Sequence, residues 1–234
     1  MSDKSIPSLV SQGYIVEYAN DESAEYRHIR FGEHAIPGAW CSNCDKPLMR
    51  IMEIDTQDPR LGMMEFPFSR LPLVYCYECS LCLGTLYYKV QHDSSISIIH
   101  FEESDWSSEE AYHEVPQRIP ASGVKVRPLT PEEQEFIISG YQTMPTCWGP
   151  DEQAPEYLYL YGHSDQIGGF PFLDNNWSDY QFNCPRCERE MEFLATFCNS
   201  TQNTEMMLAE EDPQLVYAYC THCHVVGTTH TNCM

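Results

Sequence analysis

The sequence predicts a mainly β protein (β-rich α+β) made of two pseudo-repeated halves of antiparallel sheet, each with a four-cysteine zinc ribbon. Three observations lead to this fold. Short apolar runs rich in β-branched and aromatic residues recur along the chain. Only one segment has clear helix signals, and paired cysteines recur at a nearly constant spacing. With 234 residues, the chain is long enough for one large domain or two small ones with a hydrophobic core.

The predicted strands are short runs bounded by polar residues, Gly or Pro, as is usual in antiparallel sheets. They cover residues 71–77, 85–90, 95–101, 157–161, 191–197 and 215–219. In the run 157–161, Tyr and Leu alternate, so we expect one face to pack and the other to meet solvent.

The clearest helix is predicted to begin at Pro131. Thr130 suits the N-cap, Pro131 suits the first helical position, and Glu133 can close a capping box. Gly140 is the expected end of this helix, because Gly commonly follows the last helical turn.

Cysteine-containing motifs recur in the same order and indicate two related halves. The corresponding segments are 40–44 and 183–187 at an offset of 143 residues, 73–77 and 215–219 at 142, and 79–82 and 220–223 at 141. The Pro- and Gly-containing stretch 115–123 lies between them. The predicted organisation is an N-terminal half with the first ribbon (1–115), a linker (116–130) and a C-terminal half with the second ribbon (131–234).

The cysteine pairs predict two structural zinc sites, because a Cys-x-x-Cys turn supplies two thiolates from one side of a tetrahedron. The N-terminus has no secretory signal and the chain has no long apolar run, so we expect a reducing, cytoplasmic setting and metal ligands rather than disulfides. The second site is predicted to be Cys184, Cys187, Cys220 and Cys223. Such closed sites lack the open position of a catalytic zinc.

The first zinc site has two possible ligand sets. Cys41 and Cys44 form one pair, and the second pair comes from the triplet Cys76, Cys79 and Cys82. The repeat offsets favour Cys79/Cys82 over Cys76/Cys79, and both pairs stay open. Three further cysteines, Cys147, Cys198 and Cys233, are expected to be free thiols.

The charge balance limits the partners of this protein. Against 35 Asp and Glu the chain has 13 Lys and Arg, a formal net charge of −22. Binding to nucleic-acid phosphates needs clustered Lys and Arg, and an anionic membrane surface would repel the chain, so neither partner is expected. The charge predicts a basic protein partner.

One set of motifs resembles a known family. His163, the Gly168-Gly169-x-Pro171 element, the Cys184-Pro-x-Cys187 pair, residues 191–195 and the final Tyr-x-Tyr-Cys-x-x-Cys are similar to the YwqG-like family of unknown function. They also resemble the related C-terminal region of programmed cell death protein 2. The resemblance is clearest over residues 157–234 and implies a mostly β, pseudo-repeated fold with ribbons. Relatives are regarded as chaperones of a basic ribosomal protein or as immunity proteins against toxins.

These observations predict a non-enzymatic, acidic binding module that covers a basic protein. The partner would be a toxin domain, for an immunity protein, or a nucleic-acid-binding client, for a dedicated chaperone. The alternative is a metal-dependent or carboxylate-based hydrolase, although the chain lacks His-Glu-x-x-His and Gly-x-Ser-x-Gly motifs. A pocket that joins Asp, Glu and His near His163, His222 or His224 would favour this alternative.

Overall fold

The structure is a computed structural model, and it describes residues 12–18, 26–32, 36–61, 65–76, 85–102, 121–143, 165–170, 182–197 and 215–230. Strands make up most of the regular structure in these ranges, which confirms the mainly β prediction. No helix among them is long and apolar enough to cross a bilayer. The predicted strand 157–161 lies outside the described residues.

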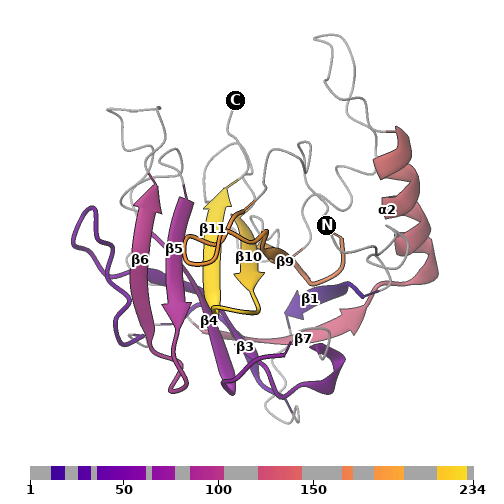
Figure 1. Cartoon of the computed structure of the whole chain (residues 1–234). Helices are drawn as coiled ribbons and strands as arrows, with labels where there is room; N and C mark the ends of the chain where they lie inside the picture. Colours follow the sequence, from indigo (N-terminus) through magenta and orange to yellow (C-terminus); the bar gives the residue numbers. More distant parts are fainter. Residues whose placement is uncertain are drawn as a thin grey trace.

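Eleven strands form one antiparallel sheet that curls on itself (Figure 1). In their order across the sheet they are β4 (Arg70–Tyr75), β3 (Met49–Asp55), β2 (His28–Arg30), β7 (Ser122–Pro128), β1 (Tyr14–Tyr18), β8 (Gln166–Ile167), β9 (Glu192–Phe197), β10 (Leu215–Cys220), β11 (Val225–His230), β5 (Thr85–Val90) and β6 (Ile96–Glu102). A short 3-10 turn, η1 (Pro59–Leu61), and one helix, α2 (Pro131–Thr143), complete the described elements.

This single sheet corrects the prediction of two repeated halves. Strands from both sides of the predicted linker interleave, since β5 pairs with β11 and β1 pairs with both β7 and β8. The linker itself contains β7, which lies between β1 and β2. Val124 and Val126 are buried there and alternate with more exposed basic residues, the pattern of a strand. Gly123 and Pro128 lie within this strand, so the described part of the segment does not separate two sheets.

Five predicted strands agree with β4, β5, β6, β9 and β10 to within two residues at each end. The sequence analysis named no strand at β1, β2, β3, β7, β8 or β11. Two of these, β2 and β3, bury the arginines Arg30 and Arg50, which are 2% and 5% exposed. A buried charged side chain breaks the apolar pattern from which a strand is recognised, because it is tolerated only once its partner is in place.

The predicted capping box of α2 is confirmed. Glu133 N donates to Thr130 Oγ1 at 3.2 Å, and Thr130 N donates to Glu133 Oε2 at 2.7 Å. The expected end at Gly140 is wrong, because the helix continues to Thr143. Gly within a helix costs only about 1 kcal/mol, which does not oblige the helix to end there.

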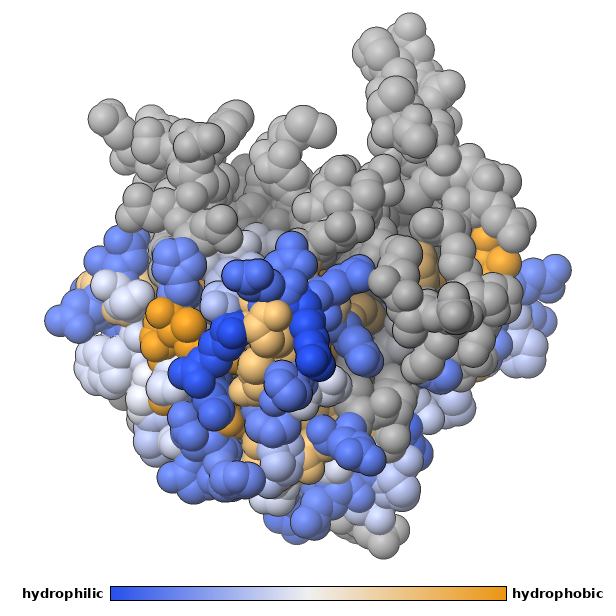
Figure 2. Space-filling view, in the orientation of Figure 1, coloured by the Kyte–Doolittle hydropathy of each residue, from blue (hydrophilic) through white to orange (hydrophobic). Residues whose placement is uncertain are grey.

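The two faces of the sheet bury different side chains. Along β10, the residues that face the main core are Leu215, Tyr217 and Tyr219. The residues between them face the opposite side and belong to a second, small core, which consists of Tyr87, Phe182, Cys184, Met191, Phe193, Val216, Ala218, Cys220 and Val225. In the orientation of Figure 1, the described surface is mainly hydrophilic and its apolar patches are small and separate (Figure 2).

The Gly168-Gly169 turn has the backbone that its sequence predicts. The φ values are 62° and 79°, in the region that favours glycine. A Cβ at Gly169 would lie 2.6 Å from Gly13 Cα, so the turn also allows close approach to the residue before β1. The element is therefore a structural turn at this position.

Candidate metal centres

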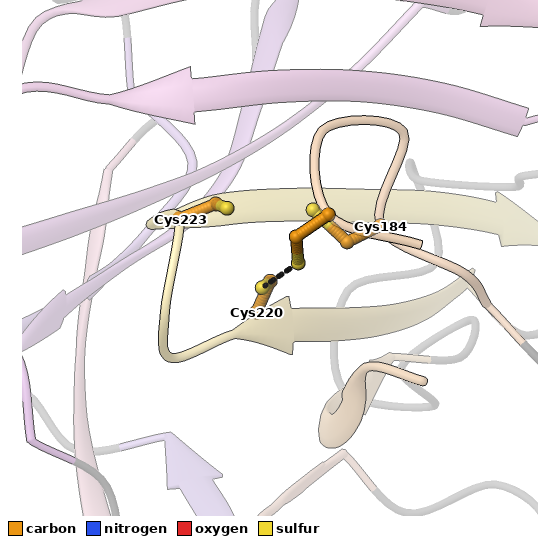
Figure 3. A group of neighbouring side chains, drawn as sticks. Cys184, Cys220 and Cys223 are labelled. Carbon is orange, nitrogen blue, oxygen red and sulfur yellow. Dashed lines mark hydrogen bonds between the residues drawn. The ribbon is translucent and has the colours of Figure 1, made fainter. Parts of the chain in front are cut away.

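The second cluster brings together the four cysteines that the sequence predicts as one metal site: Cys184, Cys187, Cys220 and Cys223. Their sulfur atoms all lie within 4.8 Å of one another. The first pair lies in the turn before β9, and the second pair lies where β10 turns into β11. Figure 3 shows Cys184, Cys220 and Cys223 approaching a common centre from these two turns. The structure thus assembles one site from segments far apart in sequence.

Each cysteine pair of the second cluster lies in a tight turn closed by a backbone hydrogen bond. Glu188 N donates to Cys184 O, and His224 N donates to Cys220 O, both at 2.8 Å. Glu188 and His224 have φ values of 58° and 57°. The residue after the second cysteine therefore adopts the left-handed conformation, which turns both thiols to the same side.

The first cluster consists of Cys41, Cys44 and Cys76. The sulfur atoms of Cys44 and Cys76 are 3.6 Å apart. The turn that carries Cys41 and Cys44 repeats the geometry of the second cluster, because Asp45 N donates to Cys41 O at 3.0 Å and Asp45 has a φ of 54°. Three cysteines that could serve as metal ligands therefore lie together among the described residues.

The position of Cys76 bears on the choice left open by the sequence. Cys79 and Cys82 lie outside the described residues, as do Cys147, Cys198 and Cys233. The structure places Cys76 beside Cys41 and Cys44, as the Cys76/Cys79 alternative requires.

The two clusters are built on equivalent hairpins, although the halves that contain them are not separate sheets. The equivalent residues are Trp40 and Asn183, Pro47 and Glu190, the bulged Ile51 and Leu194, and Tyr75 and Tyr219. Since Tyr75 matches Tyr219, the next residue, Cys76, matches Cys220. The repeat is thus confined to a cysteine turn followed by a bulged strand pair.

The sequence alignment of these hairpins was displaced by two residues. It matched Leu73 with Leu215, whereas the strand pairing matches Leu73 with Tyr217. A displacement of two residues along a strand returns every side chain to the same face. The hydrophobic pattern cannot detect such a shift, and the preference for Cys79/Cys82 rested on the displaced alignment.

Both clusters fit a metal ion and do not fit disulfides. Sulfur atoms around a tetrahedral zinc lie roughly 3.8 Å apart, given Zn–S bonds of about 2.3 Å. The Cys44–Cys76 and Cys187–Cys220 sulfur distances are 3.6 and 3.7 Å, and none of the seven described cysteines is in a disulfide. In each turn the first cysteine is buried and the second half-buried, so a bound ion would be largely shielded from water. The two clusters can therefore hold metal ions.

The thiols of the second cluster differ in acidity when no metal is bound. A backbone hydrogen bond from Arg189 and hydrogen bonds from the neighbouring thiols lower the pKa of Cys187 to about 7. Loss of solvent contact raises the pKa of Cys223 to about 12 and also raises that of Cys220. Four thiolates this close repel one another, so a divalent cation is needed to hold them all in the ionised form.

A surface groove of about 470 Å³ lies beside the second cluster. Its lining residues are Glu65, Phe66, Pro67, Arg189, Thr221, His222 and His224. Tyr219 Oη lies 2.8 Å from His224 Nδ1, and burial raises the pKa of Tyr219, so the hydroxyl stays protonated. The groove brings one carboxylate, that of Glu65, into a lining with two imidazoles, and no Asp is among its described lining residues. His163 lies outside the described residues.

A buried His–Asp pair, absent from the sequence analysis, connects β2 to the residues around η1. His28 Nε2 lies 3.0 Å from Asp58 Oδ2, and Asp55 N donates to His28 Nδ1 at 3.1 Å. Both ring nitrogens are thus engaged, and the side chain has no solvent exposure. The pair is a structural link, and nothing in the spacing of two single residues 30 positions apart indicates it.

No family model, curated protein or solved structure matches the chain. The resemblance to the YwqG-like family therefore stays an expectation based on the quoted motifs.

Proposed function

We propose that both cysteine clusters bind zinc as a structural ion. The second site would use Cys184, Cys187, Cys220 and Cys223, and the first would use Cys41, Cys44, Cys76 and Cys79. All-thiolate tetrahedral sites are typical of zinc, which suits soft ligands and has no redox chemistry of its own. The sulfur distances and the absence of disulfides among the described cysteines support this assignment.

Cys79 is the fourth ligand of the first site in this proposal. Each described cysteine turn has two residues between its ligands, and Cys76 is equivalent to Cys220, so the partner equivalent to Cys223 is Cys79. Native mass spectrometry would test this. The Cys76→Ser and Cys79→Ser variants should each lose one zinc, whereas Cys82→Ser should keep both; loss of one zinc in Cys82→Ser with both kept in Cys76→Ser would restore the Cys79/Cys82 pair.

We further propose that the protein is a non-enzymatic acidic module that covers a basic protein partner. One observation carries this proposal: the acidic excess is unevenly distributed along the chain. The framework, meaning the 131 described residues, has 11 Lys and Arg and 15 Asp and Glu, a net charge of −4. The other 103 residues have 2 Lys and Arg and 20 Asp and Glu, a net charge of −18.

This distribution supports an electrostatic role for the acidic segments. Within the framework, Arg30, Arg50 and Arg127 are paired with carboxylates, so much of the charge is neutralised internally. The remaining residues carry 20 of the 35 Asp and Glu. A concentrated negative charge accelerates encounters with a basic protein and favours it over acidic competitors.

Two matched variants would test the role of the acidic segments. One replaces Glu210, Glu211 and Asp212 with their amides, and the other replaces the exposed framework residues Glu132, Glu135 and Glu192. Both change the net charge by +3. The association rate with cytochrome c, a folded basic probe, and with an oligolysine peptide, an unfolded one, would be measured across a salt series.

The first variant should slow association more than the second, and salt should slow association of the unmodified chain by roughly tenfold or more. Preference for the folded probe favours the immunity role, and preference for the peptide favours the chaperone role. Equal effects of the two variants, or an association rate indifferent to salt, would contradict the proposal.

The groove beside the second cluster supports the hydrolase alternative, since Glu65, His222 and His224 line it together. A carboxylate and an imidazole can act as acid and base when a substrate lies between them. Hydrolysis of activated esters by the purified chain, lost in the Glu65→Gln and His222→Ala variants, would establish this alternative. Activity that survives both changes, or no activity, would remove it.

A further inference from the structure

The curled sheet has two ends, β4 and β6, and the described residues show no backbone ladder between them. The curl is closed by side chains instead. Val74 N donates to Tyr88 Oη at 3.3 Å, and the same hydroxyl donates to Pro72 O at 3.0 Å. These bonds connect β4 to β5, the strand next to β6. The closed form therefore depends on contacts outside the strand pairing.

Most backbone groups on the free edge of β4 form hydrogen bonds with side chains. In addition to the bonds from Tyr88, Tyr217 Oη donates to Val74 O at 3.3 Å, and Ser94 Oγ donates to Arg70 O at 2.9 Å. Pro72 itself has no backbone N–H that needs an acceptor, which suits an edge strand. Because Ser94 belongs to the turn between β5 and β6, this edge is attached to the opposite end of the sheet.

The beginning of β6 is covered by the segment that leads into the first cysteine turn. Ile96 N donates to Pro37 O at 2.9 Å. Gly38 has a φ of 82°, and a Cβ at this position would lie 1.9 Å from Ile96 O. Only glycine permits this approach, so the segment and β6 are fitted to each other.

The first cluster connects these two ends of the sheet. Cys76 directly follows β4, while Cys41 and Cys44 directly follow the segment that covers β6. Ala39, Cys41, Leu48 and Cys76 are buried in the main core together with Ile96 and Tyr88. We propose that the first cluster, once it holds a metal ion, is the clasp that keeps the curled sheet closed. This inference rests on the proposed metal binding.

The second cluster provides the contrast. Its cysteines flank β9, β10 and β11, which are neighbours held by continuous ladders, and its side chains pack in the small core on the other face. Loss of a metal there leaves the contacts between the two ends of the sheet intact. The two sites therefore differ in the strands that they connect, although their turns are alike.

Two amides report on closure: Val74, bonded to Tyr88, and Ile96, bonded to Pro37. Hydrogen exchange at these amides would be compared in the full chain and in Cys44→Ser and Cys187→Ser, which alter equivalent positions of the two clusters. Native mass spectrometry would count the zinc ions of each variant. We expect each variant to lose one zinc. Only Cys44→Ser should accelerate hydrogen exchange at both amides, by roughly tenfold or more.

A third variant tests the clasp without changing a thiol. Gly38→Ala should keep both zinc ions and still accelerate exchange at Ile96, because its Cβ displaces the covering segment. The clasp is overturned if Cys44→Ser loses its zinc and both amides stay protected, if Cys187→Ser accelerates them equally, or if Gly38→Ala leaves Ile96 unchanged. Retention of both zinc ions in Cys44→Ser would overturn the metal assignment as well.

Discussion

The two cysteine clusters have the same local construction and different surroundings. In both, a cysteine turn precedes a bulged strand, and a buried cysteine lies at the end of the partner strand: Cys76 directly after β4, and Cys220 as the last residue of β10. The first cluster is buried within the main core, whereas the second belongs to the small core on the opposite face of the sheet. One equivalent position beside the clusters differs in size, since Ala39 corresponds to Phe182, whereas Leu48 and Met191 are similar in volume.

The difference shows that a cysteine turn determines only its own local geometry. The residues against which it packs are determined by the rest of the chain. The backbone bonds of the turn need only a few consecutive residues, so they can be repeated almost unchanged. The core against which the turn packs depends on strands from elsewhere. For the small core these are β5 and β11, which pair only because the two parts of the chain share a sheet.

The largest effect is expected when a buried ligand is removed from either cluster. Cys41→Ser and Cys184→Ser alter equivalent residues, each 1% exposed. Each should lose one zinc and several kcal/mol of unfolding free energy, given the about 10–16 kcal/mol that structural zinc supplies in finger peptides. Denaturant unfolding should show the greater loss for Cys41→Ser, because its cluster belongs to the main core. Equal losses would contradict the distinction between the cores.

A smaller effect is expected at Arg30, which connects the two hairpins. Its guanidinium pairs with Asp165 at 3.0 Å, donates to the carbonyl of the bulged Ile51, and stacks over the ring of Phe197. Arg30→Met would leave Asp165 buried beside an apolar side chain and should cost about 3–5 kcal/mol in a thermal or denaturant measurement.

Arg127→Met is the control for a more exposed arginine: its side chain is 35% exposed, and the change removes ion pairs with Glu17 and Glu133. Its cost should be smaller than that of Arg30→Met, since pairs with solvent access contribute less. The interpretation of Arg30 also predicts that a second change, Asp165→Leu, recovers part of the loss. No recovery in the double variant would show that Arg30 acts through packing alone.

Gly227→Ala should perturb the small core selectively. A Cβ at this position would lie 2.8 Å from Phe182 Cδ1 and 3.0 Å from Tyr87 Cε1. Overpacking of this kind costs about 1–3 kcal/mol, which a denaturant titration would detect. Adding Phe182→Leu should relieve the contact. Exchange at Val74 and Ile96 should remain slow, and faster exchange there would argue that the two cores are not independent.

The smallest effect is expected from the pH dependence of the His28 link. Burial lowers the pKa of His28 in the folded chain, although the neighbouring Asp55 and Asp58 oppose this and Arg60 contributes to it. Below about pH 6.5 the unfolded chain thus binds a proton that the folded chain resists. This contribution to stability is present above that pH and is lost as the pH falls toward the folded pKa.

The stability of the unmodified chain should fall between about pH 7.5 and pH 5.5, by about 1.4 kcal/mol for each unit of pKa difference. The His28→Gln variant should therefore show a smaller fall over the same range. Denaturant midpoints measured at several pH values in both proteins would give the difference. Parallel curves would show that His28 does not titrate in this range.

The sequence indicated the β character, five strands, the capped start of α2 and the complete second cluster, because each depends on neighbouring residues. Thr130 and Glu133 form their box within one turn of chain, and a Cys-x-x-Cys turn carries its own backbone bonds. Where the same reasoning extended over longer distances, it failed. The alternation along β4 looks the same after a shift of two residues, and β7 looked like a linker because its neighbours β1 and β2 are remote in sequence.

The sequence by itself therefore determined which local pieces this chain builds and which thiols can share a metal. Only the tertiary structure decided how the pieces are ordered in one sheet, which face each cysteine cluster occupies, and that Cys76 lies beside Cys41 and Cys44. The physical reason is the range of the interactions. Caps, turns and alternation act over a few residues, whereas strand order and burial depend on which distant segments satisfy one another's backbone groups and apolar surfaces.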